Sequence, residues 1–277
     1  MSQLPATRAQ ALNDMHRTGE LLVVANAWDV ASARTLVAAG FPTLATTSAG
    51  VAWSAGFSDG QAMPVEEMLA AVARIANSVD VPISADFEAG YTDATGGIDE
   101  TVRALIDAGV AGVNVEDGAF DGSSATGIVN MTAHADLIRG AREAANELGV
   151  PLFINGRTDV YWRGVGEPER RLEEAMERLR AFGDAGADCA FAPGLTDGED
   201  IAALAESLPI PLNVMSMPGM PSLAELARLG VARVTVGANL LIAALGLIEQ
   251  IANELRDGQL IDHAGPSEAA LRAVMGG

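Results

Sequence analysis

The chain has 277 residues, 49% of them hydrophobic and 19% charged, with a net charge of −20 at pH 7; this composition allows a large buried core and excludes a mainly disordered chain. Such an acidic surface would repel a nucleic-acid backbone, so we expect no nucleic-acid partner. All 17 basic residues are arginine, which excludes chemistry that needs lysine: Schiff bases, pyridoxal phosphate anchors and Walker-type phosphate loops.

Strand and helix patterns alternate along the chain after an N-terminal extension over residues 1–18 that is expected to be helical or polar. Short apolar and β-branched runs predict strands, and helical spacing of apolar residues, often closed by glycine, predicts helices. In chain order, the strand–helix pairs are expected at 21–27 and 30–40, 43–49 and 64–79, 81–88 and 98–109, 111–116 and 132–149, 152–157 and 167–186, 188–192 and 197–208, 211–215 and 222–230, and 233–236 and 240–258. Residues 50–56 are expected to form a loop, and the tail after 258 a short helix at most.

Eight strand–helix pairs without a break in composition predict one (β/α)₈ barrel of the TIM type, a single domain over residues 1–277 with C-terminal helices in 240–277. A doubly wound sheet is the competing fold, but it would not naturally give eight equal units. The N-terminus has no apolar signal core, and no apolar run is long enough to cross a bilayer, so we expect a cytoplasmic protein without a membrane partner. The single Cys189 fits a reducing compartment.

Acidic residues gather at the predicted carboxyl ends of the strands, where a barrel enzyme carries its chemistry. Asp86 and Glu88 lie two residues apart, so on a strand they would face the same side. Like charges held together are costly unless a cation or a proton separates them, and an oxygen-only set suits Mg²⁺ or Mn²⁺. We expect Asp86 to bind the metal, with Glu88, Asp59 and Glu116 holding its waters. Capping of a following helix is the alternative, especially for Asp59.

Other polar residues at the strand ends suggest substrate contacts. Arg157 could pair with Asp159 or Glu116, could bind a substrate carboxylate or enolate oxygen, or could do both. Ser48, with the backbone amides that follow it, could bind a carboxylate. No histidine stands at a predicted strand end, which argues against a histidine triad or a zinc site.

Five motifs together resemble the isocitrate lyase/phosphoenolpyruvate mutase family over roughly residues 26–255. They are Asn26-Ala27-Trp28-Asp29, Thr47-Ser48-Ala49-Gly50, Ala85-Asp86-Phe87-Glu88-Ala89-Gly90-Tyr91, Val115-Glu116-Asp117 and Gly156-Arg157-Thr158-Asp159. The resemblance implies a Mg²⁺-dependent enzyme that makes or breaks a bond to C3 of a pyruvate unit through a metal-bound enolate. It also implies a homotetramer, a dimer of dimers in which the eighth helix packs on the neighbouring barrel, and the apolar run 240–247 suits that exchange.

Carried over to this chain, the resemblance assigns a role to each site residue. Asp86 becomes the direct metal ligand, and Asp59, Glu88 and Glu116 act through water. Arg157 stabilises the enolate oxygen, and Ser48 with the Ala49 amide binds the substrate carboxylate. Asn213 matches an asparagine that lies near the substrate in the lyase branch.

The loop after the fourth strand departs from the family. Lyases carry a K-x-C-G-H signature there, and the mutase and phosphonopyruvate hydrolase branch uses Lys and Asn; residues 116–124 contain no Lys, Cys, His or Asn. Cys189 is no substitute, because a buried thiol of this kind is usually a small hydrophobic residue. Tyr91, Asp121 and solvent remain candidates for the proton donor.

These observations favour a Mg²⁺-dependent lyase that acts on a small, oxaloacetate-like 2-oxo acid by C–C cleavage or decarboxylation. Decarboxylation needs no dedicated acid to start it, which fits the altered loop. The first alternative is a phosphoenolpyruvate or phosphonopyruvate mutase or hydrolase. The second is a non-catalytic barrel that binds 2-oxo acids.

Overall fold

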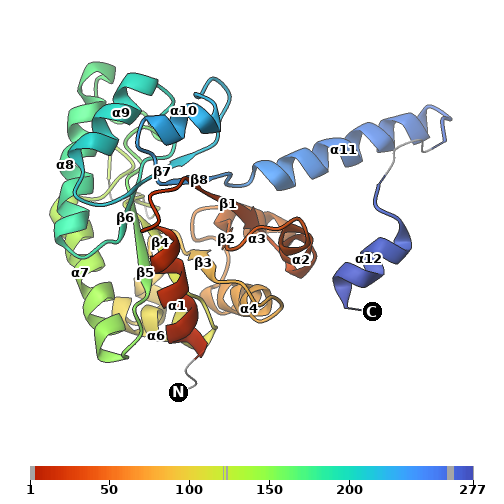
Figure 1. Ribbon diagram of the computed structural model, residues 1–277, viewed down its shortest axis with the longest axis horizontal. Helices are drawn as coiled ribbons and strands as arrows, with labels where there is room; N and C mark the ends of the chain where they lie inside the picture. The colour runs from red at the N-terminus through yellow and green to blue at the C-terminus, as the bar shows by residue number, and fades with distance from the viewer. Residues whose placement is uncertain (1–3, 121, 123, 261–264, 277) are drawn as a thin grey trace.

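Eight parallel strands close into a barrel in the order of the sequence, β1 to β8. The computed structural model describes residues 4–120, 122, 124–260 and 265–276. Within these residues, the helices surround the strands (Figure 1), and the predicted (β/α)₈ fold is confirmed. The strands are β1 (Leu22–Ala27), β2 (Leu44–Thr46), β3 (Ile83–Asp86), β4 (Gly112–Glu116), β5 (Phe153–Arg157), β6 (Cys189–Phe191), β7 (Leu212–Met215) and β8 (Arg233–Thr235).

The register of the strands determines which side chains meet at the carboxyl edge. Asp86 of β3 is the register partner of Asn114 of β4, which is in turn the partner of Asn155 of β5. The barrel closes where β8 pairs with β1, with Val234 beside Val23. Parallel pairing therefore brings polar residues from separate segments into one row.

The expected helix follows each strand, and five short helical segments are added to the eight. The eight are α2 (Val30–Ala38), α4 (Val65–Ala76), α6 (Ile98–Asp107), α7 (Met131–Glu147), α8 (Arg171–Asp184), α9 (Gly198–Ser207), α10 (Leu223–Arg228) and α11 (Asn239–Arg256). The additions are α1 (Leu4–Met15), α3 (Ser48–Ser54), α5 (Thr92–Thr95), η1 (Pro168–Arg170) and α12 (Glu268–Met275).

The loop expected at residues 50–56 is wrong, because α3 occupies most of it. Thr47 caps this helix: its Oγ1 accepts a hydrogen bond from the Gly50 amide at 3.4 Å. Val51 and Ala52 are buried against the core. The two glycines suggested a loop, but capping and burial of one face outweigh their low helix propensity.

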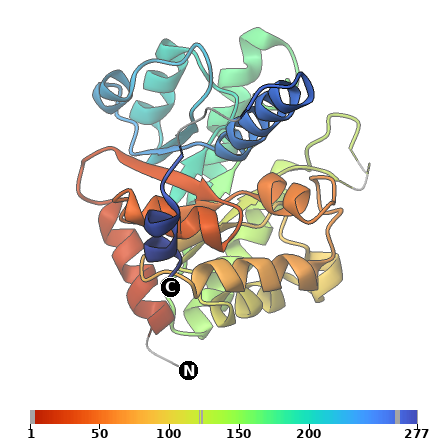
Figure 2. The same ribbon diagram turned by 90° about the vertical axis from the view of Figure 1, so that its right-hand side faces the viewer.

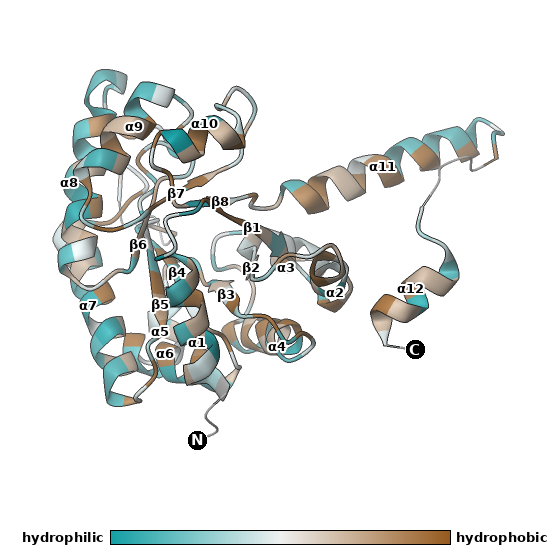
Figure 3. Ribbon diagram, viewed as in Figure 1, coloured by the Kyte–Doolittle hydropathy of each residue, from teal (hydrophilic) through white to brown (hydrophobic). Residues whose placement is uncertain are grey.

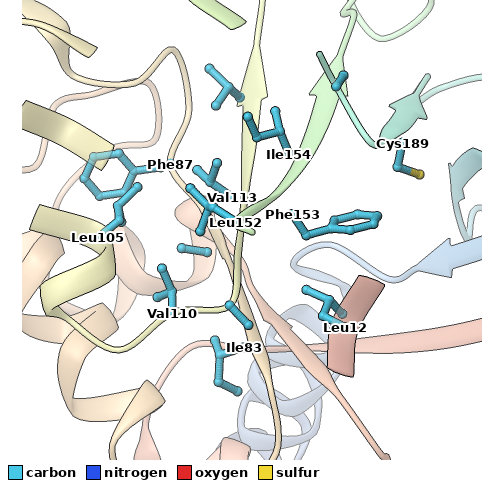
Figure 4. Close-up of a cluster of buried hydrophobic side chains, with 14 of the residues drawn as sticks. Leu12, Ile83, Phe87, Leu105, Val110, Val113, Leu152, Phe153, Ile154 and Cys189 are labelled. Atoms are coloured by element: carbon cyan, nitrogen blue, oxygen red, sulfur yellow. The ribbon is translucent and has the colours of Figure 1, made fainter. Parts of the chain in front are cut away.

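Helix α1 closes the end of the barrel opposite to the strands' carboxyl ends. The His16 ring stacks on Phe153 with 4.1 Å between ring centres, and Asn13 donates to the Pro151 carbonyl at 2.9 Å. Leu12 and Phe153 belong to the same cluster of buried side chains (Figure 4). Helix α1 therefore covers this end of the barrel.

Helix α11 extends away from the barrel, and α12 returns on the side of α2 (Figures 1 and 2), where Arg34 donates to the Met275 carbonyl. Large apolar side chains remain exposed along α11: Ile242 is 52% exposed, Leu245 49% and Ile248 60%. Brown segments along this helix mark its hydrophobic residues (Figure 3). No helix among the described residues has the length and apolar character needed to cross a membrane.

Candidate active site

Asp86 ends β3 at the barrel mouth and is held by three hydrogen-bond donors. The Ser48 amide and hydroxyl donate to Oδ2 at 2.9 and 2.8 Å, and Asn114 Nδ2 donates to Oδ1 at 2.8 Å. Asn155 Nδ2 in turn donates to Asn114 Oδ1 at 3.0 Å. A carboxylate has about four lone-pair sites, so Asp86 keeps one free, on Oδ1. Asp86 is therefore a rigid carboxylate with capacity for one further partner.

Glu88 lies beside Asp86, but not for the reason predicted from the strand period. Strand β3 ends at Asp86, and Glu88 has a left-handed backbone with φ of 51°, so the two-residue alternation of a strand does not apply. The Glu88 side chain is 1% exposed and accepts hydrogen bonds from the Tyr91 hydroxyl at 3.1 Å and from the Gln61 amide. Burial, and next the charges of Asp59 and Asp86, raise the pKa of Glu88 to about 8.

Three neighbouring residues depart from ordinary backbone geometry. Gln61, Glu88 and Tyr91 all have positive φ, of 60°, 51° and 51°, a conformation that costs non-glycine residues about 1 kcal/mol or more each. Gln61 Oε1 accepts from the Tyr91 amide at 2.9 Å, so the three residues hold one another. Sequence analysis missed Gln61, because no residue-type signal marks a left-handed glutamine.

Asp59 and Glu116 complete the acidic set from opposite sides. Asp59 lies at the exposed rim, where partial desolvation and the charge of Asp86 raise its pKa. Glu116 at the end of β4 is only 4% exposed, and burial raises its pKa although Arg157 opposes the rise. Each of these carboxyls therefore lies in surroundings that disfavour negative charge.

Arg157 is the positively charged residue nearest to this acidic set, and it makes both of the ion pairs considered from the sequence. Its Nη1 lies 2.6 Å from Glu116 Oε2, and its Nε lies 2.7 Å from Asp159 Oδ1. The guanidinium carbon also lies 5.7 Å from the centre of the Phe191 ring. Burial lowers the pKa of Arg157, but Glu116 and Asp159 raise it by more, so the guanidinium stays charged.

Two other strand-end acids have structural roles. Asp29 caps α2 through the Ser32 amide at 2.7 Å. Asp117 is fully buried and accepts from Thr158 Oγ1 at 2.7 Å and from Arg178 Nη1 at 3.1 Å. These residues stabilise the ends of the strands and leave the acidic set to the four predicted carboxylates.

The set of donors fits a hard divalent cation. Its four carboxylates are an oxygen-only set of the kind that binds Mg²⁺. Among the residues that the structure describes, no three acidic, histidine or cysteine side chains converge closely enough to hold a metal ion directly. The one free position on Asp86 can accept a single bond to such an ion.

A cavity of about 40 Å³ lies inside the barrel below Asp86 and Arg157. Asn213, predicted to lie near the substrate, is completely buried in β7, and its Oδ1 accepts from Thr235 Oγ1 at 3.5 Å; it is absent from the residues that line the cavity. Ser48 is occupied with Asp86, and Ala49 follows it in the first turn of α3. The substrate roles of Ser48, Ala49 and Asn213 stay predictions.

The segment after β4 packs over the mouth without the residues that the family uses there. Gly118 pairs with Ile128 in an antiparallel bridge, and the Phe120 ring lies so close to Gly60 that a Cβ there would be 3.0 Å from it. The guanidinium carbon of Arg163 also lies 5.1 Å from the centre of the Phe120 ring. Asp121, one of the candidate proton donors, lies outside the described residues.

Comparison with known proteins matches this arrangement of motifs to one family. Residues 12–256 match the family model described as phosphoenolpyruvate phosphomutase. The chain belongs to the phosphoenolpyruvate phosphomutase family. Among the relatives with named activities are a protein of Corynebacterium glutamicum described as 2-methylisocitrate lyase 2, 29% identical, and an oxaloacetate decarboxylase of Pseudomonas entomophila, 28% identical over 65% of this chain. The predicted resemblance is thereby confirmed.

Three relatives show how far the similarity extends. An uncharacterized protein of Mycobacterium tuberculosis is 32% identical over 256 residues, which are 92% of this chain and 93% of that protein. A solved Burkholderia cenocepacia protein described as a lyase/mutase is 38% identical with a TM-score of 0.89, covering 98% of this chain and 96% of its own. Oxaloacetate acetylhydrolase, solved with its product oxalate, is 28% identical with a TM-score of 0.84, covering 99% and 94%.

Asp159 provides a test of how the site is held. Its side chain is 1% exposed and pairs with both Arg157 and Arg163, so Asp159→Asn should lower the free energy of unfolding by about 2–4 kcal/mol, because Arg163 loses this acidic partner and the buried Arg157 keeps only its pair with Glu116. Asp136→Asn, which removes an exposed pair with Arg139, should change it by less than about 0.5 kcal/mol. Urea unfolding measures both; equal effects would contradict the buried pairing.

Proposed function

We propose that this protein is a Mg²⁺-dependent lyase that acts on a small 2-oxo acid, oxaloacetate-like in size and charge, by C–C cleavage or decarboxylation. The observation that carries the proposal is the combination at one barrel mouth of a rigid, partly free carboxylate, Asp86, and a charged guanidinium, Arg157. The named activities of relatives, among them oxaloacetate acetylhydrolase, support the same substrate class.

The residues of the site have two roles: the carboxylates hold the metal ion, and Arg157 stabilises negative charge on the substrate. When bound, Mg²⁺ supplies positive charge to the oxygens of the 2-oxo acid, with Asp86 as its direct ligand and Asp59, Glu88 and Glu116 acting through water. Arg157 faces the same region and can stabilise negative charge that develops on the enolate oxygen. Ser48 and the amide of Ala49 are the proposed binders of the substrate carboxylate, and Asn213 is a proposed neighbour of the substrate.

The protonation step distinguishes this chain from lyases that carry the K-x-C-G-H loop. Without that signature, the Tyr91 hydroxyl is a donor within the described site, but it is bonded to Glu88 and burial raises its pKa strongly, which makes it a weak acid. Solvent protonation of the enolate is compatible with both reactions. Decarboxylation in particular begins without an acid.

Two other functions are less well supported than the lyase. A phosphoenolpyruvate or phosphonopyruvate mutase or hydrolase would use the same metal and the same arginine, but residues 116–124 lack the Lys and Asn of that branch. A non-catalytic barrel that binds 2-oxo acids would keep the acidic set and release no product.

A substrate panel with one variant separates these functions. We expect Mg²⁺-dependent release of pyruvate or another 2-oxo acid from an oxaloacetate-like substrate and from neither phosphonopyruvate nor phosphoenolpyruvate, and Asp86→Asn should abolish both turnover and Mg²⁺-dependent binding of oxalate. Coupled pyruvate detection and calorimetry measure the two. Oxalate binding without any turnover would favour the non-catalytic barrel, and unchanged oxalate affinity in Asp86→Asn would refute the metal assignment.

We also propose that the protein is a homotetramer in which α11 packs on a neighbouring barrel. The large exposed side chains of this helix, Ile242, Leu245 and Ile248, favour a second copy as their cover, because such an apolar stripe is unfavourable in water. Light scattering should give four times the mass of one chain. Ile248→Asp should lower that mass, whereas Gln250→Asp, a charge change two residues away, should not; an unaltered tetramer in Ile248→Asp would contradict the proposal.

A further inference from the structure

Arg233 is a buried arginine that the proposed mechanism does not use. It stands at the start of β8, is 1% exposed and is the largest fully buried side chain. In the part of the chain that the structure describes, its Nε and Nη1 have no hydrogen-bond partner. A buried charge without a partner is strongly unfavourable. A bound ligand that accepts hydrogen bonds from Arg233 would remove this cost.

A second buried arginine shows what a structural role looks like in this fold. Arg178 is 8% exposed, and its Nη1 donates to Asp117 at 3.1 Å and to the Val129 carbonyl at 3.0 Å, while its Nε donates to Glu174 at 2.7 Å. Arg178 therefore joins three segments of the chain. Arg233 joins none.

The unpaired side chain of Arg233 lines the same small cavity as Asp86 and Arg157. Two more lining residues carry buried polar atoms without partners, Ser84 Oγ and Asn155 Oδ1. Unpaired polar groups from β3, β5 and β8 thus line one cavity of about 40 Å³. A polar cavity of this size admits water or a group as small as a carboxylate.

Charges on the surrounding residues leave this floor of the barrel positive. His16 of α1 stays neutral, because burial and the charge of Arg233 lower its pKa to about 3. The Cys189 thiol also stays neutral, since burial raises its pKa to about 12. Asp86 is the acid whose charge acts on Arg233; three of its hydrogen-bond positions are engaged with Ser48 and Asn114, and the proposed function assigns the fourth to the cation.

We propose that Arg233, with Ser84, binds a carboxylate-sized anion at the floor of the active site and thereby selects 2-oxo acids that carry a second negative group. The guanidinium and the Ser84 hydroxyl donate to the anion, and a water beside it donates to Asn155 Oδ1. This inference rests on the proposed function for the identity of the anion as part of the substrate. The anion site itself rests only on the cavity.

The anion site also bears on the reaction. A carboxylate held by Arg233 is stabilised as a carboxylate, so it is a poor group to lose as carbon dioxide. For an oxaloacetate-like substrate anchored in this way, the site favours hydrolysis of the C2–C3 bond over decarboxylation: water supplies oxygen to C2 and a proton to C3, and the anchored carboxylate stays on one of the two products.

The first test measures the anion site without metal or substrate. In EDTA, formate should raise the unfolding temperature of the wild type in a saturable manner, whereas gluconate at equal ionic strength, too large for the cavity, should not. Arg233→Met should lose the formate effect and be at least as stable as the wild type without formate. Arg178→Met should instead be less stable, because it leaves Asp117 buried and unpaired.

A second arm connects the anion site to the substrate. With Mg²⁺, Arg233→Met should weaken oxaloacetate binding by about tenfold to a hundredfold, the range for losing a charge-assisted contact, and leave the affinity for pyruvate unchanged.

If Arg233→Met does not fold, Arg233→Lys should keep part of the formate effect. A formate effect equal in wild type and variant, or absent from the wild type, would overturn the anion site. Failure of oxaloacetate to bind the wild type, with the formate effect intact, would refute the proposed function and leave the anion site in place.

Discussion

Repulsion among carboxylates at the barrel mouth is the constraint on which the rest of the site depends. Asp59, Asp86, Glu88 and Glu116 come from separate segments, and the charge of Asp86 acts on each of the other three. Such a set is stable only if protons or cations offset its charge. Arg157 offsets part of the charge through Glu116, and a divalent cation would offset the remainder.

The scaffold holds this unfavourable set in place by hydrogen bonds that converge on Asp86. Asn155 orients Asn114, Asn114 orients Asp86, and Ser48 fixes the other carboxylate oxygen. The left-handed backbone at Gln61, Glu88 and Tyr91 adds strain next to the same residue. Strain and like charge gathered at one place are typical of a functional site rather than of a stabilising one. Arg233 is a further unfavourable group in the barrel, a buried arginine whose Nε and Nη1 have no hydrogen-bond partner among the described residues.

The sequence predicted the eight strand–helix pairs and the four acids because both follow from local patterns. Apolar periodicity is visible in any window, and strand ends in a barrel share one edge. It did not reveal that Asn114 and Asn155 orient Asp86, because strand register depends on pairing between distant segments. Arg233 escaped notice because it stands within a short apolar run, and only the closed barrel shows that its side chain lacks a partner. The loop prediction for residues 50–56 is wrong because α3 continues to Ser54, and burial against the barrel, which composition does not reveal, stabilises this helix.

The most direct test of the central claim is the free energy of unfolding with and without Mg²⁺, in the absence of any substrate. If the acidic set needs a cation, Mg²⁺ should stabilise the wild type by about 2.7 kcal/mol at a concentration one hundred times its dissociation constant, beyond the effect of NaCl at equal ionic strength. Unfolding in EDTA and in Mg²⁺ that differs by no more than the salt control would contradict the account.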